Sequence, residues 1–428
     1  MTRRLRAVIA FLLGLSLLAL PGVAHAQPAP CFDPAAPLTV EEGRLVDRLA
    51  PDGPEVGPEL VRLAGLDDEV GRFTARLCEP LTRAQATAWA LTGGAELWRA
   101  AVERAHEQRT QEQRTQEQQG WDSYDDRPLY WARLLGTRAL RQWQPRGWRL
   151  GDADRARLVE SFDRASRGVH DLRFTGGVRR VAVTGFDPFQ LSGTSVRRSN
   201  PAGAAALRLD GRVLDTPSGP VVVEAAVLPV LWGAFDRGVV ERFYGTALAA
   251  RPAAVVTISQ GRPGRFDVER WAGRWRGGFP DNDDVSVRGV VPDAAGWPQP
   301  ALEFIETTLP HQRLVDAGTT PFPVLYNREF CEWPLGTTPG TGTPSCRTDE
   351  PTPGAAAASG SGGDYLSNES MYRANRLRLG LGATATAGGH LHTPVLGQPA
   401  DQAALTDAAF EADRRAIVDQ VVALVSVV

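Results

Sequence analysis

The sequence predicts an α/β fold in the second half of the chain, with a mainly helical domain before it. Two patterns support this. From Gln27 to about Val178 the apolar residues recur at helical spacings, whereas from Arg179 short β-branched runs alternate with helical segments. Such alternation is typical of a mostly parallel sheet covered by helices. We expect a targeting segment over residues 1–26, a helical domain over 27–177 and the α/β domain over 178–428.

The first residues have the pattern of a secretory signal peptide. Arg3, Arg4 and Arg6 precede an apolar run from Ala7 to Leu20, and Ala24-His25-Ala26 fits a cleavage site. We therefore expect export and cleavage after Ala26. No later segment approaches 18 consecutive apolar residues, so a membrane span is not expected.

Net charge and cysteine content limit the partners and ligands that we expect. The formal net charge is -3 and all the basic residues are arginine, which gives no indication of nucleic-acid binding. Four cysteines in an exported chain indicate two disulfides. Cys31 with Cys78 and Cys331 with Cys346 is the expected local pairing, although three connectivities are possible. No cysteine has a zinc spacing with histidine, so neither a metal nor a cofactor is expected.

In the helical part, residues 81–91 and 95–105 are predicted helices, begun by Thr82 or Gly94. The repeat over residues 107–116 is interpreted as a solvated helix extension or a flexible tract. Aromatic residues are frequent over residues 121–148, where a core role is favoured over a carbohydrate or peptide platform. They are Trp121, Tyr124, Tyr130, Trp131, Trp143 and Trp148. No function is predicted for this domain.

Strand and helix signals alternate after Arg179. Residues 181–184, 221–230 and 253–259 are predicted strands, while Asn200-Pro201 opens a helix and residues 232–244 form another. Ligands of parallel sheets bind at the loops that follow the strands. The loops at Gly185, at Gln260 and before Ser367 are therefore expected to converge.

A segment over about 331–362, rich in Pro, Gly and Ala, is predicted to be a disulfide-pinned loop insertion. We expect its Ala/Ser/Gly half to be mobile. A lid over the site and a surface loop without a role are both open. Residues 401–428 have the spacing of an amphipathic terminal helix.

Three separated residues suggest acyl-transfer chemistry. Ser367 stands at the start of a predicted helix, His392 on a following strand, and Glu269 is the candidate acid that orients the imidazole. A serine before Asn-Glu is also a common helix cap, so that structural interpretation stands beside the functional one. His390 is two residues before His392 and shares its face on a strand, but the His-x-Pro context favours His392.

Taken together, several motifs resemble the pyroglutamyl-peptidase I family over about residues 179–398. They are Thr184-Gly185-Phe186-Asp187-Pro188-Phe189, Asn200-Pro201, Leu228-Pro229-Val230, Gln260-Gly261-Arg262, Val268-Glu269-Arg270, Pro280-Asp281-Asn282, Ser367-Asn368 with Met371-Tyr372, and His392-Thr393-Pro394. The resemblance implies an α/β/α sandwich and a peptidase that removes an N-terminal pyroglutamyl residue with a Glu, a Cys and a His.

By position, the resemblance assigns the acid to Glu269, the base to His392 and the nucleophile to Ser367, where the family has cysteine. Phe186 and Phe189 match the aromatic pair that flanks the lactam ring. Further wall residues are Gln260, Tyr365 and Leu366. The family also has an arginine shortly before Pro-Asp-Asn, and here Arg274 or Arg276 is the expected substitute.

The sequence thus favours an exported pyroglutamyl-peptidase-like hydrolase acting on peptides with a blocked N-terminus. The alternative is a catalytically inactive family member that binds such N-termini or serves as an envelope interaction protein. A hydroxyl must lose its proton as it attacks, whereas a thiol can be stored as the thiolate, so the serine makes turnover depend on a well-placed base.

Overall fold

The computed structural model describes residues 31–107, 122–216 and 218–428. The predicted signal peptide, Trp121 and all of the repeat except Glu107 lie outside these ranges. Residues 31–428 form one compact unit. Among the described residues, no helix is both long and apolar enough to cross a membrane.

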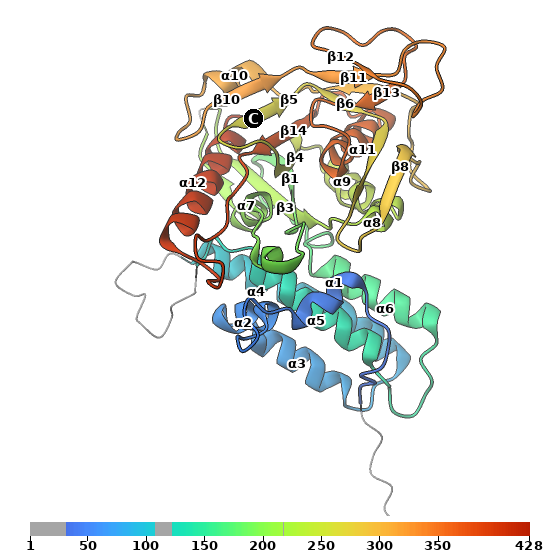
Figure 1. Cartoon of the computed structure of the whole chain (residues 1–428), viewed down its shortest axis with the longest axis vertical. Helices are drawn as coiled ribbons and strands as arrows, with labels where there is room; N and C mark the ends of the chain where they lie inside the picture. The colour runs from blue at the N-terminus through green and yellow to red at the C-terminus, as the bar shows by residue number, and fades with distance from the viewer. Residues whose placement is uncertain (1–30, 108–121, 217) are drawn as a thin grey trace, which may run out of the picture. The chain divides into compact units, whose positions relative to one another are not determined.

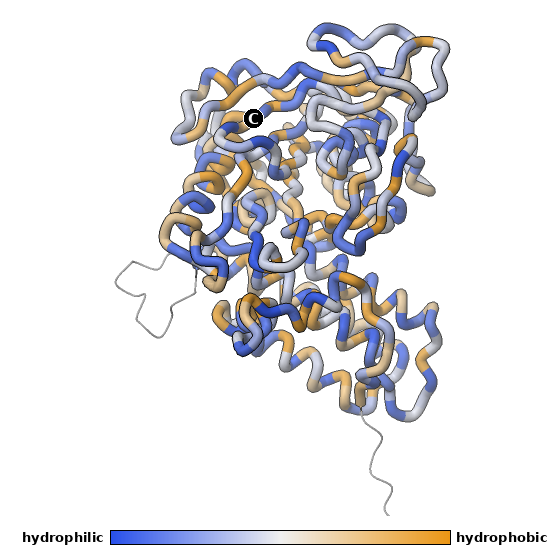
Figure 2. Tube along the Cα trace, in the orientation of Figure 1, coloured by the Kyte–Doolittle hydropathy of each residue, from blue (hydrophilic) through white to orange (hydrophobic). Residues whose placement is uncertain are grey.

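A set of helices precedes the sheet (Figure 1): α1 Val40–Gly43, α2 Val56–Leu63, α3 Asp67–Leu77, α4 Arg83–His106, α5 Arg127–Gln142 and α6 Asp152–Ala165. Hydrophobic and hydrophilic residues alternate along them, as the colours of Figure 2 show. The aromatic residues Tyr130, Trp131 and Trp143 are each at most 1% exposed, which confirms their core role.

The structure differs from the prediction at α4, which runs unbroken through two glycines. A Cβ on Gly93 would lie 2.3 Å from the ring of Phe73, and one on Gly94 would lie 2.4 Å from the carbonyl oxygen of Phe162. The glycines therefore allow helices to pack closely and do not end the helix. Thr82 does cap α4, through a capping box with Gln85.

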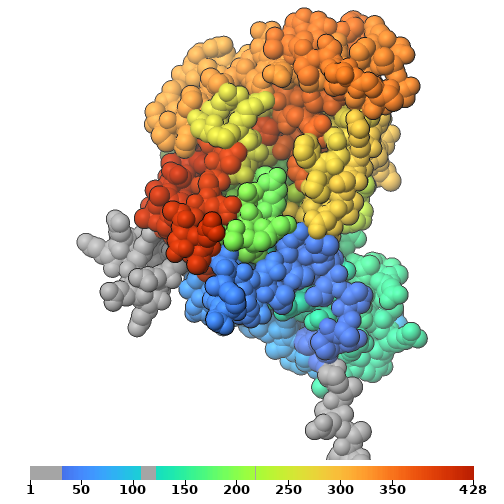
Figure 3. Space-filling model, viewed as in Figure 1, coloured from blue at the N-terminus to red at the C-terminus, as the bar shows by residue number. Residues whose placement is uncertain are grey.

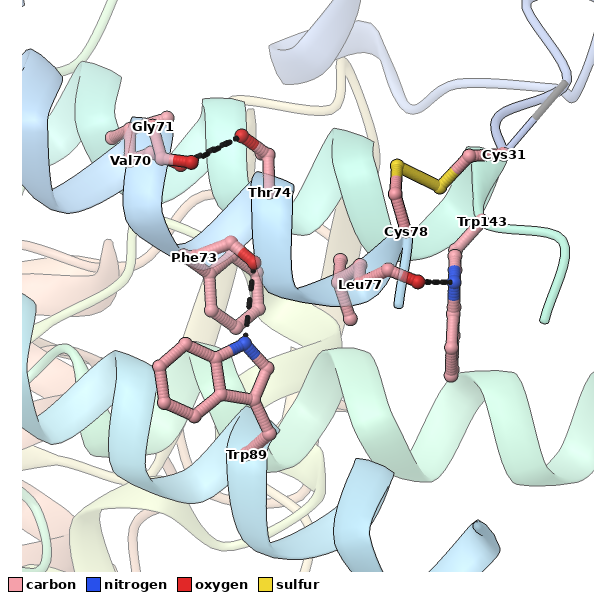
Figure 4. Close-up of a disulfide and its surroundings, with 9 residues drawn as sticks. All are labelled: Cys31, Val70, Gly71, Phe73, Thr74, Leu77, Cys78, Trp89 and Trp143. Atoms are coloured by element: carbon pink, nitrogen blue, oxygen red, sulfur yellow. Dashed lines mark hydrogen bonds between the residues drawn. A yellow bond between two sulfur atoms is a disulfide. The ribbon is translucent and has the colours of Figure 1, made fainter. Parts of the chain in front are cut away.

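Both expected disulfides are present, Cys31–Cys78 and Cys331–Cys346. Figure 4 shows the first beside Trp143, whose indole N–H donates to the carbonyl oxygen of Leu77 at 2.6 Å. The disulfide joins the segment before α1 to the C-terminal end of α3. Its two cysteines are 47 residues apart, so the bond links the ends of a long helical segment.

The main sheet has seven strands in the order β10-β5-β14-β4-β1-β3-β2. The strands are β1 Arg179–Phe186, β2 Val213–Leu214, β3 Val221–Leu228, β4 Ala254–Gln260, β5 Phe266–Glu269, β10 Val324–Asn327 and β14 Ala387–Thr393. The four central strands, β14, β4, β1 and β3, are parallel to one another, while β2 and β5 pair antiparallel to their inner neighbours. The predicted mostly parallel sheet is confirmed.

Helices cover both faces of this sheet (Figure 1). Side chains on alternate faces of β1 enter two hydrophobic clusters, one containing residues of α7 Pro201–Leu209 and α12 Ala408–Val425, the other containing residues of α9 Val239–Ala249 and α11 Leu366–Gly380. The arrangement is the α/β/α sandwich. The predicted helix over 232–244 is divided into α8 Trp232–Asp236 and α9, because Gly238 has a left-handed φ of 74°.

Smaller elements surround the strand ends: β6 Trp271–Gly273 with β9 Phe304–Glu306, β7 Trp275–Pro280 with β8 Ser286–Val290, and α10 His311–Asp316. The predicted loop insertion contains a sheet of its own, in the order β12 Ser345–Arg347, β11 Phe330–Glu332, β13 Ala357–Ser359. Figure 3 shows this orange segment on the surface. Ala355, Ala357 and Ala358 are buried, and part of its Ala/Ser/Gly half forms the packed strand β13.

Candidate active site

A cavity of about 600 Å³ opens at the carboxyl ends of the parallel strands. The loops after β1, β4 and β14 and the first turn of α11 all contribute to its wall. This is the convergence that the alternation of strands and helices predicts. Seven of the eight predicted site residues line the cavity: Phe186, Phe189, Gln260, Tyr365, Leu366, Ser367 and His392. The eighth, Glu269, is fully buried and binds His392.

The imidazole of His392 is held by a carboxylate. Its Nδ1 lies 2.7 Å from Oε1 of Glu269, at the end of the neighbouring antiparallel strand. A carboxylate accepts hydrogen bonds, so Nδ1 is the donor in this pair and Nε2 is not engaged by Glu269. Asn327 on β10 donates its amide to Oε2 of Glu269 at 2.7 Å. Three adjacent strands thus fix a chain from amide to carboxylate to imidazole.

His390 has a structural role. Its Nδ1 lies 2.7 Å from the hydroxyl of Thr257, and its Nε2 lies 2.9 Å from that of Ser259. The residue is fully buried, and burial, together with His392, lowers its pKa well below the usual value. A neutral ring with both nitrogens engaged is unsuited to proton transfer. The choice of His392 as the base stays a prediction.

Two glycines enclose the ring of His392. A Cβ on Gly261 would lie 2.6 Å from its Cγ, and a Cβ on Gly362 would lie 3.0 Å from its Cε1. Gly261 belongs to the Gln-Gly motif after β4, while Gly362 is the last residue of the insertion. The end of the insertion is therefore part of the cavity wall, whereas the sequence left open whether the insertion covers the site or is a surface loop without a role.

Ser367 occupies the first turn of α11 and is half-buried in the cavity wall. The first backbone bond of this helix runs from the N–H of Glu369 to the carbonyl oxygen of Tyr365 at 3.0 Å. The N–H groups of residues 366–368 have no acceptor within the described chain. Such groups, at the positive end of the helix dipole, are suited to an oxyanion.

Residues on both sides of the serine anchor the helix. The amide of Asn368 exchanges two hydrogen bonds of 2.8 Å with the backbone of Gly273. Glu369 accepts a bidentate ion pair from Arg276, with both contacts at 2.6 Å. The Ser-Asn-Glu sequence therefore places one side chain at the cavity and binds the next two to the strands beside it.

The arginine that we expected before Pro-Asp-Asn does not reach the cavity. Arg276 is occupied by Glu369 and Asp236, and Arg274 lies near Glu303 and Asp293. Neither side chain is in the cavity wall. Any oxyanion contact at this site must therefore come from other donors.

Apolar side chains form one wall of the cavity. Phe186 is buried and stacks on Phe235, with ring centroids 6.1 Å apart. Tyr365 packs edge-on against Trp232 and donates its hydroxyl to the carbonyl oxygen of Pro280 at 2.9 Å. The hydroxyl bond directs the ring of Tyr365 into the wall, where its face supplies apolar contact area.

The side chain of Gln260 provides a polar group at the cavity. Its Oε1 accepts from the backbone N–H of Leu396 at 2.8 Å, which fixes the amide and leaves Nε2 as a donor. A site with one apolar wall, a fixed amide, a serine and an oriented imidazole is suited to a small ring that carries polar groups. No cluster of three or more His, Cys, Asp or Glu side chains that fits a metal ion occurs in the described ranges.

Comparison with known proteins adds a family. The model of the PA0049 N-terminal domain matches residues 24–163, and that of the PA0049 C-terminal domain matches residues 180–302 and 298–397. The chain is 32% identical to "Uncharacterized protein PA0049" of Pseudomonas aeruginosa PAO1, over 91% of this chain and 88% of that protein.

Two structures of pyroglutamyl peptidase I from Bacillus amyloliquefaciens show 18% and 19% identity at a TM-score of 0.36. They cover 57% and 58% of this chain and 97% and 95% of their own. Because the PA0049 domain models match both halves in order and the Pseudomonas protein aligns along nearly all of the chain, the protein belongs to the PA0049 family.

Proposed function

We propose that the protein is an exported serine-type hydrolase that removes an N-terminal pyroglutamyl or similar cyclic residue from peptides. The observation that carries the proposal is the His392–Glu269 pair at the same cavity as Ser367. The motif resemblance to pyroglutamyl-peptidase I adds the substrate class. Phe186 and Phe189 are the proposed ring contacts.

In the proposed reaction, Oγ of Ser367 attacks the pyroglutamyl carbonyl carbon while its proton passes to Nε2 of His392. Glu269 stabilises the imidazolium that forms, and the free N–H groups of α11 hold the oxyanion. The proton then moves from His392 to the leaving amine as the amide bond breaks. Water, deprotonated by the same imidazole, hydrolyses the acyl-serine and restores the hydroxyl.

Export to an oxidising compartment would favour a serine nucleophile over a cysteine at position 367. A low-pKa thiolate exposed to an oxidising compartment is prone to oxidation and disulfide exchange, whereas a hydroxyl is inert. The disulfides Cys31–Cys78 and Cys331–Cys346 fit the same environment. N-terminal sequencing of the exported protein tests the expected cleavage after Ala26.

One observation favours a second candidate, a binding protein without turnover. Within the described residues, no hydrogen bond joins the hydroxyl of Ser367 to His392. A site that holds a blocked N-terminus without attack would retain the ring wall and the fixed amide of Gln260. Calorimetry with a pyroglutamyl peptide that remains intact throughout the titration would support this candidate.

Release of product from a pyroglutamyl anilide separates the two. We expect release by the parent, background release by Ser367→Ala, and near-parental release by Ser370→Ala. Ser370 is the matched control because it lies on the same helix and its hydroxyl bonds the carbonyl oxygen of Ser367 outside the cavity wall. Equal rates for the parent and Ser367→Ala would reject the serine mechanism.

A further inference from the structure

The cavity contains an arginine with no acidic partner. Arg198 lines the cavity and donates to Oε1 of Gln190 at 2.6 Å, which is a neutral acceptor. No carboxylate in the described part of the chain forms an ion pair with it. Burial alone lowers its pKa, since no nearby acid compensates the charge. A partly desolvated cation without a counter-ion is unfavourable unless a ligand supplies the anion.

The charged side chains in the described part of the cavity wall are all positive. None of the described residues that line the cavity is Asp or Glu, whereas Arg198 and Arg262 both do so. Arg262 is different because it pairs with Asp267 at 3.0 Å and is 43% exposed. Of the two arginines that line the cavity in the described part of the chain, Arg198 is thus the one that remains available to a ligand.

Arg198 also has a defined place relative to the ring wall. Its partner Gln190 directly follows Phe189, is exposed, and has a left-handed φ of 56°. Residues other than glycine adopt that conformation at a cost, and such strain is concentrated in functional loops. The Arg198–Gln190 contact therefore lies on the loop of the ring-binding phenylalanines, toward solvent.

We propose that Arg198 binds a carboxylate on the leaving-group side of the substrate. This inference rests on the proposed function, in which the cyclic residue occupies the apolar wall and the remaining peptide extends toward solvent. The substrate class is then a short pyroglutamyl peptide whose free α-carboxylate reaches Arg198, or one with an acidic residue after the pyroglutamyl group. A guanidinium is suited to either, because its fork matches a carboxylate.

The test uses Ser367→Ala, so that ligands bind without turnover, and calorimetry with three peptides. They are pyroglutamyl-alanine, its C-terminal amide, and pyroglutamyl-glutamate α-amide, in which only the side chain is charged. We expect the free acid to bind roughly tenfold more tightly than the alanine amide, as for a charge-assisted hydrogen bond. Tighter binding of the glutamate α-amide instead identifies the side chain as the source of the carboxylate.

Two further variants assign the effect to one residue. Adding Arg198→Gln should remove the preference for the charged peptide, whereas the matched change Arg262→Gln, in the same cavity, should retain it. Equal binding of all three peptides overturns the carboxylate inference and leaves the proposed function in place. Equal losses in both arginine variants overturn the assignment to Arg198. Failure of all three peptides to bind overturns both proposals.

Discussion

The amide of Asn327 binds the oxygen of Glu269 that His392 leaves free, with N–O distances of 2.7 Å on both sides of the carboxylate. The same amide donates to the carbonyl oxygen of Ser361 at 2.7 Å, next to Gly362. Asn327 is therefore a positioning residue. It holds the carboxylate and connects it to the segment that packs on the imidazole.

Replacing this amide should affect the rate and leave substrate binding unchanged. For Asn327→Ala we expect kcat to fall roughly tenfold to a hundredfold with KM unchanged, because a hydrogen bond to a buried carboxylate is lost. Turnover of a pyroglutamyl anilide measures both constants. In a Glu269→Gln background the same change should cost much less, since the two residues act as a unit. An equal loss in both backgrounds contradicts the positioning role.

The three proposed catalytic residues were accessible to sequence reasoning, whereas Asn327 was not. Ser367, His392 and Glu269 each lie within a recognisable motif at the expected spacing. Asn327 is 58 residues from Glu269 and meets it only through the pairing of β10 with β5. The one available signal was an asparagine at the end of the short run Val324 to Tyr326, and its partner strand is not evident without the fold.

At the level of elements, the turn after β4 and the segment before α11 approach the same imidazole, through Gly261 and Gly362. Gly261 is required because its backbone lies against the ring of His392, where a Cβ would be 2.6 Å from two ring-side atoms. The backbone of Gly261 and the ring of His392, which is hydrogen-bonded to Glu269, leave little room for either to move. The turn therefore helps to set the position of His392.

Gly261→Ala should displace His392 and lower kcat on a pyroglutamyl anilide at least tenfold, an estimate based on the sensitivity of catalysis to misplacement of about 1 Å. Gly397→Ala is the matched control. Gly397 lines the same cavity, but a Cβ there would meet nothing within 4 Å. Comparable rates for both variants would show that the close approach of Gly261 is unimportant.

Most strands and helices of the sandwich were predictable because their apolar runs are short and bounded by Gly and Pro. The failures have specific causes. Gly93 and Gly94 resemble a helix break in sequence but serve close packing within α4. The sequence of the insertion is typical of a loop, yet Ala355, Ala357 and Ala358 are buried and its strands pair with one another. Burial by distant segments is invisible to a local pattern.

At the level of the whole unit, the helical part supports the loop that carries Phe186 and Phe189. Asp187 lies between Phe186 and Phe189 and accepts from Arg133 at 2.8 Å and from Arg167 at 2.5 Å. Glu41 accepts from Asn282 at 2.9 Å, and the same amide donates to the carbonyl oxygen of Pro188. We infer that these buried contacts give the N-terminal helices a structural role at the site. The division into domains at residues 177 and 178 stays a prediction.

The buried acid at this junction should make stability depend on pH. Burial, with Asp187 and Asp283 nearby, raises the pKa of Glu41 from 4.5 to about 8. The folded state therefore keeps a proton that the unfolded chain releases near pH 4.5. The stabilisation is complete below that pH and is lost as the pH rises through 8. Asp126 and Asp210, with pKa values raised to about 7, act in the same direction.

Between pH 6.5 and 8.5 we expect the parent's free energy of unfolding to decrease, by at most about 1.4 kcal/mol per pH unit for one such group. This range avoids the opposite contribution of His390, whose pKa is lowered. Glu41→Gln should show a shallower decrease in urea titrations across the same range. The exposed control Asp52→Asn should follow the parent. Superimposed curves for the parent and Glu41→Gln contradict the assignment.

The central proposal is that Ser367 is made nucleophilic by His392 and Glu269. The most direct measurement is reaction of the protein with a fluorophosphonate, followed by mass-spectrometric mapping of the modified residue. The account predicts a single adduct on Ser367 that is lost in His392→Gln and retained in Ser370→Ala. Absence of an adduct on Ser367 in the folded parent, or equal labelling in His392→Gln, would contradict it.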